Sequence, residues 1–210
     1  MALRPRASSV RAARPRRRRT PECARAEALA SARALLLREG PDAITLQRVA
    51  SDLGVTHSNL LYHFGSAAEL RSNLMGTMVT ELAGALDSVV ASLHSDVAAS
   101  RAVVDMVFDA FVERGAGRLA AWIALTDNLD LLKPIEDAVK SLVRGIEEKF
   151  AGAGAGAGVH RGVTSAVLLL ALTAFGDSMI GGPLQSMLER DPAAPRKVVA
   201  FLLPRLFEST

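Results

Sequence analysis

The segment between Gly54 and Gly65 carries short polar side chains of the kinds that hydrogen-bond to nucleic-acid bases. It reads THSNLLYHF, from Thr56 to Phe64. On a helix, Leu60 and Phe64 are four residues apart and share one face, so we expect both to lie in the core. The remaining hydroxyl, amide and imidazole groups suit the base edges of a DNA major groove. The segment therefore predicts a recognition helix that exposes Thr56, His57, Ser58, Asn59, Leu61, Tyr62 and His63.

The residues before this segment are those needed to hold a second short helix at a sharp angle to it. A helix is predicted over residues 45–53, with Val49 and Ala50 on its inner face. Ala50 is small where two helices cross closely, and Gly54 permits a sharp turn. Val55 follows as an apolar plug in the angle between the two helices. This spacing is typical of a helix-turn-helix.

A longer helix precedes this pair. Thr20 is a good N-cap, Pro21 suits the first helical position, and Glu22 faces the positive end of the helix dipole. Helical spacing continues until Gly40 and is carried by Ala28, Leu29, Ala32, Leu35 and Leu36. We therefore expect three helices in the head.

Residues 24–75 resemble the N-terminal domain of the TetR family of regulators. The resemblance rests on the helix ending at Gly40, on ITLQRVASDLGV, on THSNLLYHF and on GSAAEL at the start of the next helix. It implies that base edges are contacted by Gln47, His57, Ser58 and Asn59. It also implies phosphate contacts by Tyr62, His63 and Thr45. The sequence departs from the family pattern at Ala67, where a lysine that contacts a phosphate is common.

The whole chain is predicted to be all-α, with about nine helices in total. After the head we expect helices near residues 66–95, 101–114, 118–128, 134–150, 160–180 and 194–207. The AGAGAGAG run at 151–158 is expected to be a flexible connector. The predicted domains are a disordered Arg-rich tail at 1–19, a helix-turn-helix domain at 20–66, and a helical effector-binding and dimerisation domain at 67–210.

The predicted body has more apolar surface than one chain can cover. The run from Val167 to Leu172 is hydrophobic all round, so it needs cover on every side. With the last helix, it resembles the helix pair through which the family forms a four-helix dimer interface. The residues expected at a homodimer interface are Val167, Leu168, Leu170, Leu172, Val198, Phe201 and Leu202. A two-fold dimer would match a palindromic operator in double-stranded DNA.

An apolar ligand pocket is a further expectation for the body. Its candidate lining residues are Phe108, Phe111, Trp122, Leu125 and Met179, all of which could equally be core. The resulting hypothesis is a sequence-specific regulator, a repressor that a small, largely apolar effector releases from its operator.

The charge distribution supports an alternative. Eight arginines lie within residues 1–19, whereas residues 20–71 hold five arginines against six acids. The tail rather than the folded head therefore carries the positive field. A non-specific architectural DNA-binding protein driven by this tail is one alternative, and an interaction protein that has lost DNA binding, as Ala67 would allow, is another.

Other classes of protein find little support in the sequence. No nucleophile elbow, phosphate-binding glycine loop or paired cysteine motif is present, so we expect no enzyme activity, no cofactor and no metal. Cys23 is the only cysteine, which fits a reducing compartment. The longest apolar run, 163–175, is too short to span a bilayer. We therefore expect a cytoplasmic protein without membrane association.

Overall fold

A computed structural model describes residues 20–90, 97–125, 133–150 and 157–208. Within these ranges every regular element is a helix, which confirms the predicted all-α class. Nine of the described α-helices have eight or more residues, and two are shorter. The predicted tail at 1–19 and most of the AGAGAGAG run lie outside the described residues.

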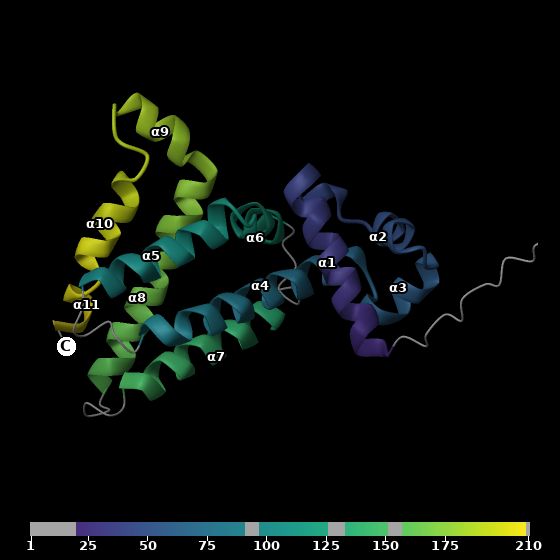
Figure 1. The fold of residues 1–210 in the computed structure, drawn as a ribbon, viewed down its shortest axis with the longest axis horizontal. Coiled ribbons are helices and arrows are strands. Elements are labelled where there is room, and N and C mark those ends of the chain that lie inside the picture. The colour runs from purple at the N-terminus through teal and green to yellow at the C-terminus, as the bar shows by residue number, and fades with distance from the viewer. Residues whose placement is uncertain (1–19, 91–96, 126–132, 151–156, 209–210) are drawn as a thin grey trace, which may run out of the picture.

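The head is a three-helix unit at one end of the molecule (Figure 1). Each of its helices begins at a threonine whose hydroxyl accepts a backbone N–H three residues on. These caps are Thr20, Thr45 and Thr56, with O···N distances of 3.3, 3.2 and 3.3 Å. Gly54 ends the second helix in the left-handed region, with φ at 63°, as the sharp turn requires. The elements are α1 (Pro21–Glu39), a 3₁₀ turn η1 (Pro41–Ala43), α2 (Leu46–Leu53) and α3 (His57–Phe64).

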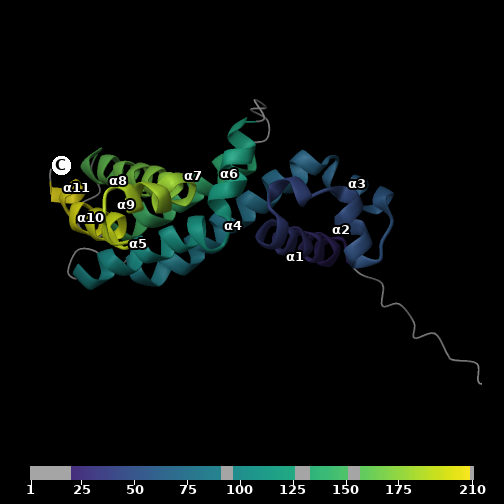
Figure 2. The ribbon, with the colours of Figure 1, turned by 90° about the horizontal axis from the view of Figure 1, so that it is seen from above.

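The body is a bundle of longer helices at the other end (Figure 2). Its long helix α4 starts in the head and crosses to the body, where it packs along α7. The elements of the body are α4 (Ala67–Val90), α5 (Val97–Val112), α6 (Ala116–Leu125), α7 (Lys133–Phe150), α8 (Ala157–Gly176), the π-helical turn η4 (Asp177–Gly181), α9 (Gly182–Met187), α10 (Ala194–Leu202) and α11 (Arg205–Glu208).

Two predicted helices of the body differ from those observed. The helix expected over 160–180 continues through the π-helical turn into α9, so the helical stretch from Gly158 to Met187 has 30 residues and a mean hydropathy of 1.7. The prediction that the run at 163–175 is too short to span a bilayer is therefore wrong, because the helical stretch that contains it is longer than the run. By length and composition this stretch could cross a membrane, a property that apolar core helices share. The helix expected over 194–207 is divided into α10 and α11 near Pro204.

Two apolar clusters form the core, and α4 belongs to both. The first holds the head together and includes Leu36, Leu60, Phe64 and Met75. The second lies between α4, α5, α8 and α10 in the body. Phe111 of α5 packs against both clusters. Through α4 and Phe111, the packing of the head is continuous with that of the body.

Candidate nucleic-acid interface and apolar cavity

Helix α3 presents the predicted hydrogen-bonding side chains on its outer face. Leu60 and Phe64 are almost fully buried beneath it, as their spacing predicted. The first turn of α3 and its cap place four polar side chains in solvent, and the second turn adds two larger exposed groups. The exposed residues are Thr56, His57, Ser58, Asn59, Leu61 and Tyr62, whereas His63 is half-buried.

The other predicted DNA contacts lie at the start of α2. Thr45, whose hydroxyl caps α2, is half-buried, and Gln47, two residues further along the chain, is exposed. Tyr62 is 86% exposed, with its ring edge-on to that of His63 at a centroid distance of 5.4 Å. A phenol that projects so far from the fold can reach a DNA backbone as a hydrogen-bond donor.

The electrostatics of the head agree with its near-neutral sequence. Arg48 of α2 donates two hydrogen bonds to Glu39, at 2.6 and 2.7 Å, so this exposed cation is already paired. The Arg48 guanidinium also holds the pKa of Glu39 below its ordinary value. Ala67 begins α4 and offers no charge there. The folded head therefore presents few unpaired cations to a phosphate backbone.

Arg25 of α1 fixes the C-terminal end of α3. Its guanidinium donates to the backbone oxygen of His63, and its second nitrogen donates to Asn73 Oδ1 of α4 at 2.9 Å. The guanidinium carbon also lies 4.6 Å from the centroid of the Phe64 ring. One side chain thus ties together α1, α3 and α4. A cation at the C-terminal end of a helix is also favoured by the helix dipole.

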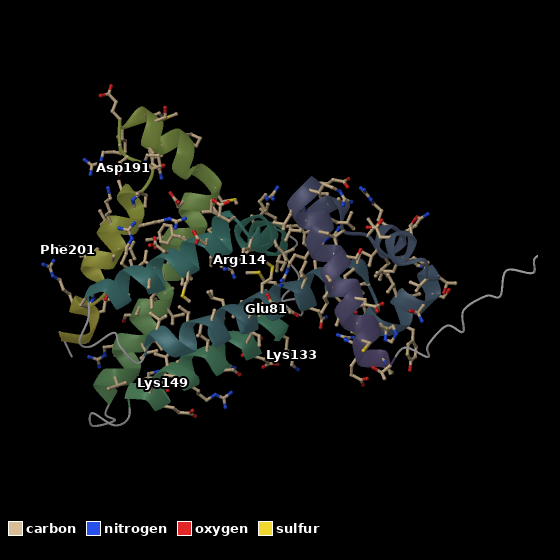
Figure 3. The ribbon with its side chains drawn as sticks, in the orientation of Figure 1. Glu81, Arg114, Lys133, Lys149, Asp191 and Phe201 are labelled. Carbon is tan, nitrogen blue, oxygen red and sulfur yellow. The ribbon has the colours of Figure 1, made fainter. Side chains whose placement is uncertain are left out.

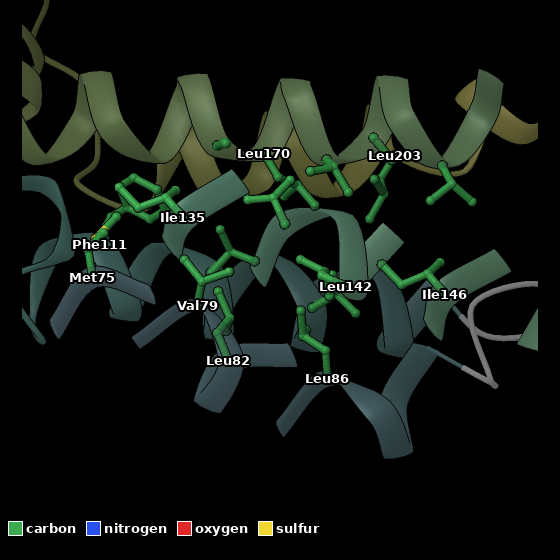
Figure 4. A pocket seen from close by; sticks show the side chains of 17 residues that line it. Met75, Val79, Leu82, Leu86, Phe111, Ile135, Leu142, Ile146, Leu170 and Leu203 are labelled. Atoms are coloured by element: carbon green, nitrogen blue, oxygen red, sulfur yellow. The ribbon is translucent and has the colours of Figure 1, made fainter. Parts of the chain in front are cut away.

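An apolar cavity of about 220 Å³ lies in the body between α4, α5, α7 and α8. Figure 4 shows Val79, Leu82 and Leu86 on one side of it and Leu170 on the other. The lining residues recur at helical spacing, as in Met75, Val79, Leu82 and Leu86 on α4. Met75 also belongs to the core of the head. The cavity wall and the head core therefore share a residue.

Phe111 is the one residue among the five predicted pocket residues that lines this cavity. For the other four, the prediction is wrong for this cavity. Phe108 is fully buried in the core beneath Arg196, whose guanidinium carbon lies 5.4 Å from the ring centroid. Trp122 packs in the junction between head and body. Leu125 and Met179 are exposed, at 86% and 37%. Helical spacing could not distinguish a cavity wall from core or surface, since apolar residues occur in all three.

The seven residues predicted at a dimer interface divide between the interior and the surface. Leu170 is buried, and both Leu170 and Val167 line the cavity, so these two face inward. The other five are exposed, and Figure 3 places Phe201 at the end of the molecule far from the head. Further exposed apolar residues lie on η4, α9 and the following loop. We call the exposed apolar side chains the outer apolar face; they are Leu168, Leu172, Ile180, Leu184, Met187, Leu188, Val198, Phe201 and Leu202.

Sequence reasoning missed the residues that tie the head to its surroundings. Arg25, Arg71 and Trp122 are far apart in the chain, and neither their types nor their spacing marks them as partners. The one sequence feature that could have drawn attention to Arg25 is its position just before the apolar stripe of α1. The cavity residues Val103, Leu142 and Ile146 follow helical spacing, but spacing alone assigns them to an apolar face and not to a hollow.

Comparisons with known proteins agree with this geometry. Residues 28–73, which include the whole helix-turn-helix, match the family described as bacterial regulatory proteins, tetR family. No curated protein matches the chain in sequence. Among solved structures, a putative TetR-family transcriptional regulator from Mesorhizobium loti MAFF303099 has the same fold, with a TM-score of 0.64 and 14% sequence identity. The alignment covers 90% of this chain and 97% of that one. The helix-turn-helix head therefore matches the tetR family of bacterial regulatory proteins, and the fold of the chain is similar to that of a TetR-family regulator.

Proposed function

We propose that the protein is a homodimeric, sequence-specific repressor that a small, largely apolar effector releases from a palindromic operator. The observation that carries the proposal is the exposure of His57, Ser58 and Asn59 on α3, held on a buried Leu60–Phe64 stripe. These side chains are short and can both donate and accept hydrogen bonds, as direct readout of base edges requires. Gln47 joins them from α2, whereas Tyr62, His63 and Thr45 are proposed to contact phosphates.

The outer apolar face supports the dimer. Large apolar side chains gathered on one face of a monomer mark an interaction surface, and a surface far from the head leaves the recognition helix free. A second copy packed face to face across a two-fold axis would cover it and give two recognition helices for two half-sites. Val167 and Leu170 are not part of this proposed interface because they face the cavity.

The cavity supports release by an effector. A ligand between α4 and α8 contacts Met75, which is also in the head core. An effector that prefers one arrangement of α4 would therefore change the population of heads spaced correctly for DNA. The size of the change is limited by the difference between the affinities of the effector for the two states.

Selection of random duplex DNA by the full-length protein at near-physiological salt tests the DNA-binding proposal. A two-fold symmetric enriched sequence is the expected outcome, and Asn59→Ala should alter the preference within each half-site. DNA bound without sequence preference would favour the architectural alternative driven by residues 1–19. Failure to bind any DNA would favour the interaction protein.

The dimer is tested by placing a charge within the outer apolar face. Leu172→Glu should yield a monomer by sedimentation and lower operator affinity at least tenfold, because a carboxylate at a dry interface stays unpaired. Ser141→Glu, on the exposed side of α7, is the matched control and should leave the dimer intact. A Leu172→Glu protein that remains dimeric would rule out this face as the interface.

A further inference from the structure

The wall of the cavity between α4, α5, α7 and α8 contains no hydrogen-bonding group among the described residues. All 17 lining side chains are aliphatic, aromatic or thioether, and no nitrogen or oxygen atom contributes to the surface. The helices satisfy their own backbone groups, so the main chain offers no donor or acceptor to the hollow. A ligand there can gain dispersion contacts and apolar burial, but it cannot form a hydrogen bond with the wall.

Ser100 carries the nearby buried hydroxyl that could have hydrogen-bonded to a ligand in the cavity. It is buried on α5, one turn before Val103 and on the same stripe, and its Oγ has no hydrogen-bond partner among the described residues. Ser100 does not line the cavity, whereas Val103 and Val107 do. The hydroxyl therefore stops short of the wall, and a ligand enclosed by Val103 and Leu170 does not meet it.

An apolar wall of this kind binds water poorly. A buried water needs two to four polar partners, and the wall provides none. Apolar hollows of about 150 Å³ lined by Leu, Ile and Phe hold no water and take up benzene. Scaling the six carbons of benzene by volume gives about nine carbons for the 220 Å³ observed here, close to the size of a bicyclic aromatic such as naphthalene.

We propose that this cavity is a site for an uncharged hydrocarbon of about nine or ten carbon atoms, such as a bicyclic aromatic or a cyclic terpene-sized molecule without a polar group. The inference deepens the proposed effector by naming its chemical class. Carboxylates, amines and phenols are disfavoured because their polar groups would lose water and gain no partner.

The test is direct binding of naphthalene to the full-length protein without DNA. Binding is measured through the fluorescence of the ligand. We expect saturable binding of one molecule per chain. The probe 1-naphthol should bind about tenfold or more weakly, since its hydroxyl would be buried without a partner. Nonanoate should bind more weakly still. Ser100→Ala should leave the naphthalene affinity unchanged.

Filling the cavity from α8 locates the site. Ala166→Leu and Ala171→Leu each add side-chain volume into the hollow, and each should lower naphthalene affinity at least tenfold. Two variants are used because either one alone could disturb folding, which thermal unfolding would reveal. Ala124→Leu on the exposed side of α6 is the matched control and should bind as the unaltered protein does.

The alternative results are distinct. Tighter binding of 1-naphthol or nonanoate than of naphthalene would overturn the proposal. A preference for nonanoate would indicate that its carboxylate lies near Thr80 and Lys149. These residues line a second hollow, between α4 and α7, which shares Leu86 with the cavity. Unchanged affinity in both folded α8 variants would also overturn it. If naphthalene binds as expected but leaves operator affinity unchanged, the site stands and the effector role in the proposed function fails.

Discussion

The guanidinium carbon of Arg71 lies 4.0 Å from the centroid of the Trp122 ring, and this contact joins α4 to α6. Arg71 Nε also donates to the backbone oxygen of Pro41 at 2.9 Å, while Trp122 Nε1 donates to Asp42 Oδ1 at 3.1 Å. Both residues therefore hold η1 of the head. Burial lowers the pKa of Arg71, and the nearby Asp42 carboxylate acts in the opposite direction.

This contact predicts energetic coupling between Arg71 and Trp122. Arg71→Met and Trp122→Leu should each destabilise the fold, and the double variant should lose less than the sum by about 0.5–2 kcal/mol, the range of a cation–π contact. Denaturant unfolding of the four proteins measures the difference. Strictly additive losses would show that the stacking contributes nothing.

Arg25 is predicted to act as a positioning residue for α3. Arg25→Met keeps an alkyl chain over Phe64 but removes the donors to His63 and Asn73, and charge-assisted hydrogen bonds contribute about 1.5–3 kcal/mol each. We expect faster amide exchange at the C-terminal end of α3 and weaker binding to all DNA sequences alike. Arg38→Met, exposed in the last turn of α1, is the control. Unchanged exchange in α3 would contradict the assignment.

The two groups of proposed DNA contacts should respond differently to mutation. His57→Ala and Asn59→Ala should relax base choice, with about 1–3 kcal/mol of discrimination lost at the contacted position. Tyr62→Phe should weaken all sequences about equally, because a phosphate contact carries no base information. Competition binding against single-base operator variants measures both effects. The reverse pattern would show that the roles are exchanged.

Gly117 is predicted to be required for close packing of α6. A Cβ at this position would lie 2.0 Å from Ser178 Oγ and 2.7 Å from Ser178 Cβ. Gly117→Ala should therefore lower the free energy of unfolding by about 1–3 kcal/mol through overpacking. Gly145→Ala on α7 meets nothing within 4 Å and should instead stabilise by about 0.5–1 kcal/mol. Equal effects in the two variants would contradict this packing argument.

Asp177 predicts a pH dependence of stability. Burial raises the pKa of this carboxyl, opposed by the charge of Arg196 and by the hydrogen bond from Gln185 Nε2 at 2.7 Å. A raised pKa means that the folded state holds the proton more tightly, so stability is lost as the pH rises from the ordinary value of 3.8 through the raised one. Asp177→Asn should remove this loss and be more stable than the unaltered protein near pH 7, but not near pH 4. Denaturant unfolding across this range measures the slope; an unchanged slope would refute the prediction.

The sequence by itself determined the head and the helical class. Threonine caps, Gly54 and the Leu60–Phe64 pair act over one or two helical turns, so local spacing alone identified α2 and α3 and their exposed faces. It also indicated that the body carries excess apolar surface, because the run through Leu168 and Leu172 is apolar on every side.

The tertiary structure decided which apolar residues face a cavity, the core or solvent. Phe108, Phe111 and Leu125 follow similar helical rules, yet one lies in the core, one lines the cavity and one is exposed. The same holds for Leu170 and Leu172, two residues apart on α8, of which only Leu172 is exposed. Spacing fixes which side chains share a helix face, but only the packing of other helices against that face decides what it meets. The contacts of Arg25 and Arg71 likewise depend on residues that lie far away in the chain.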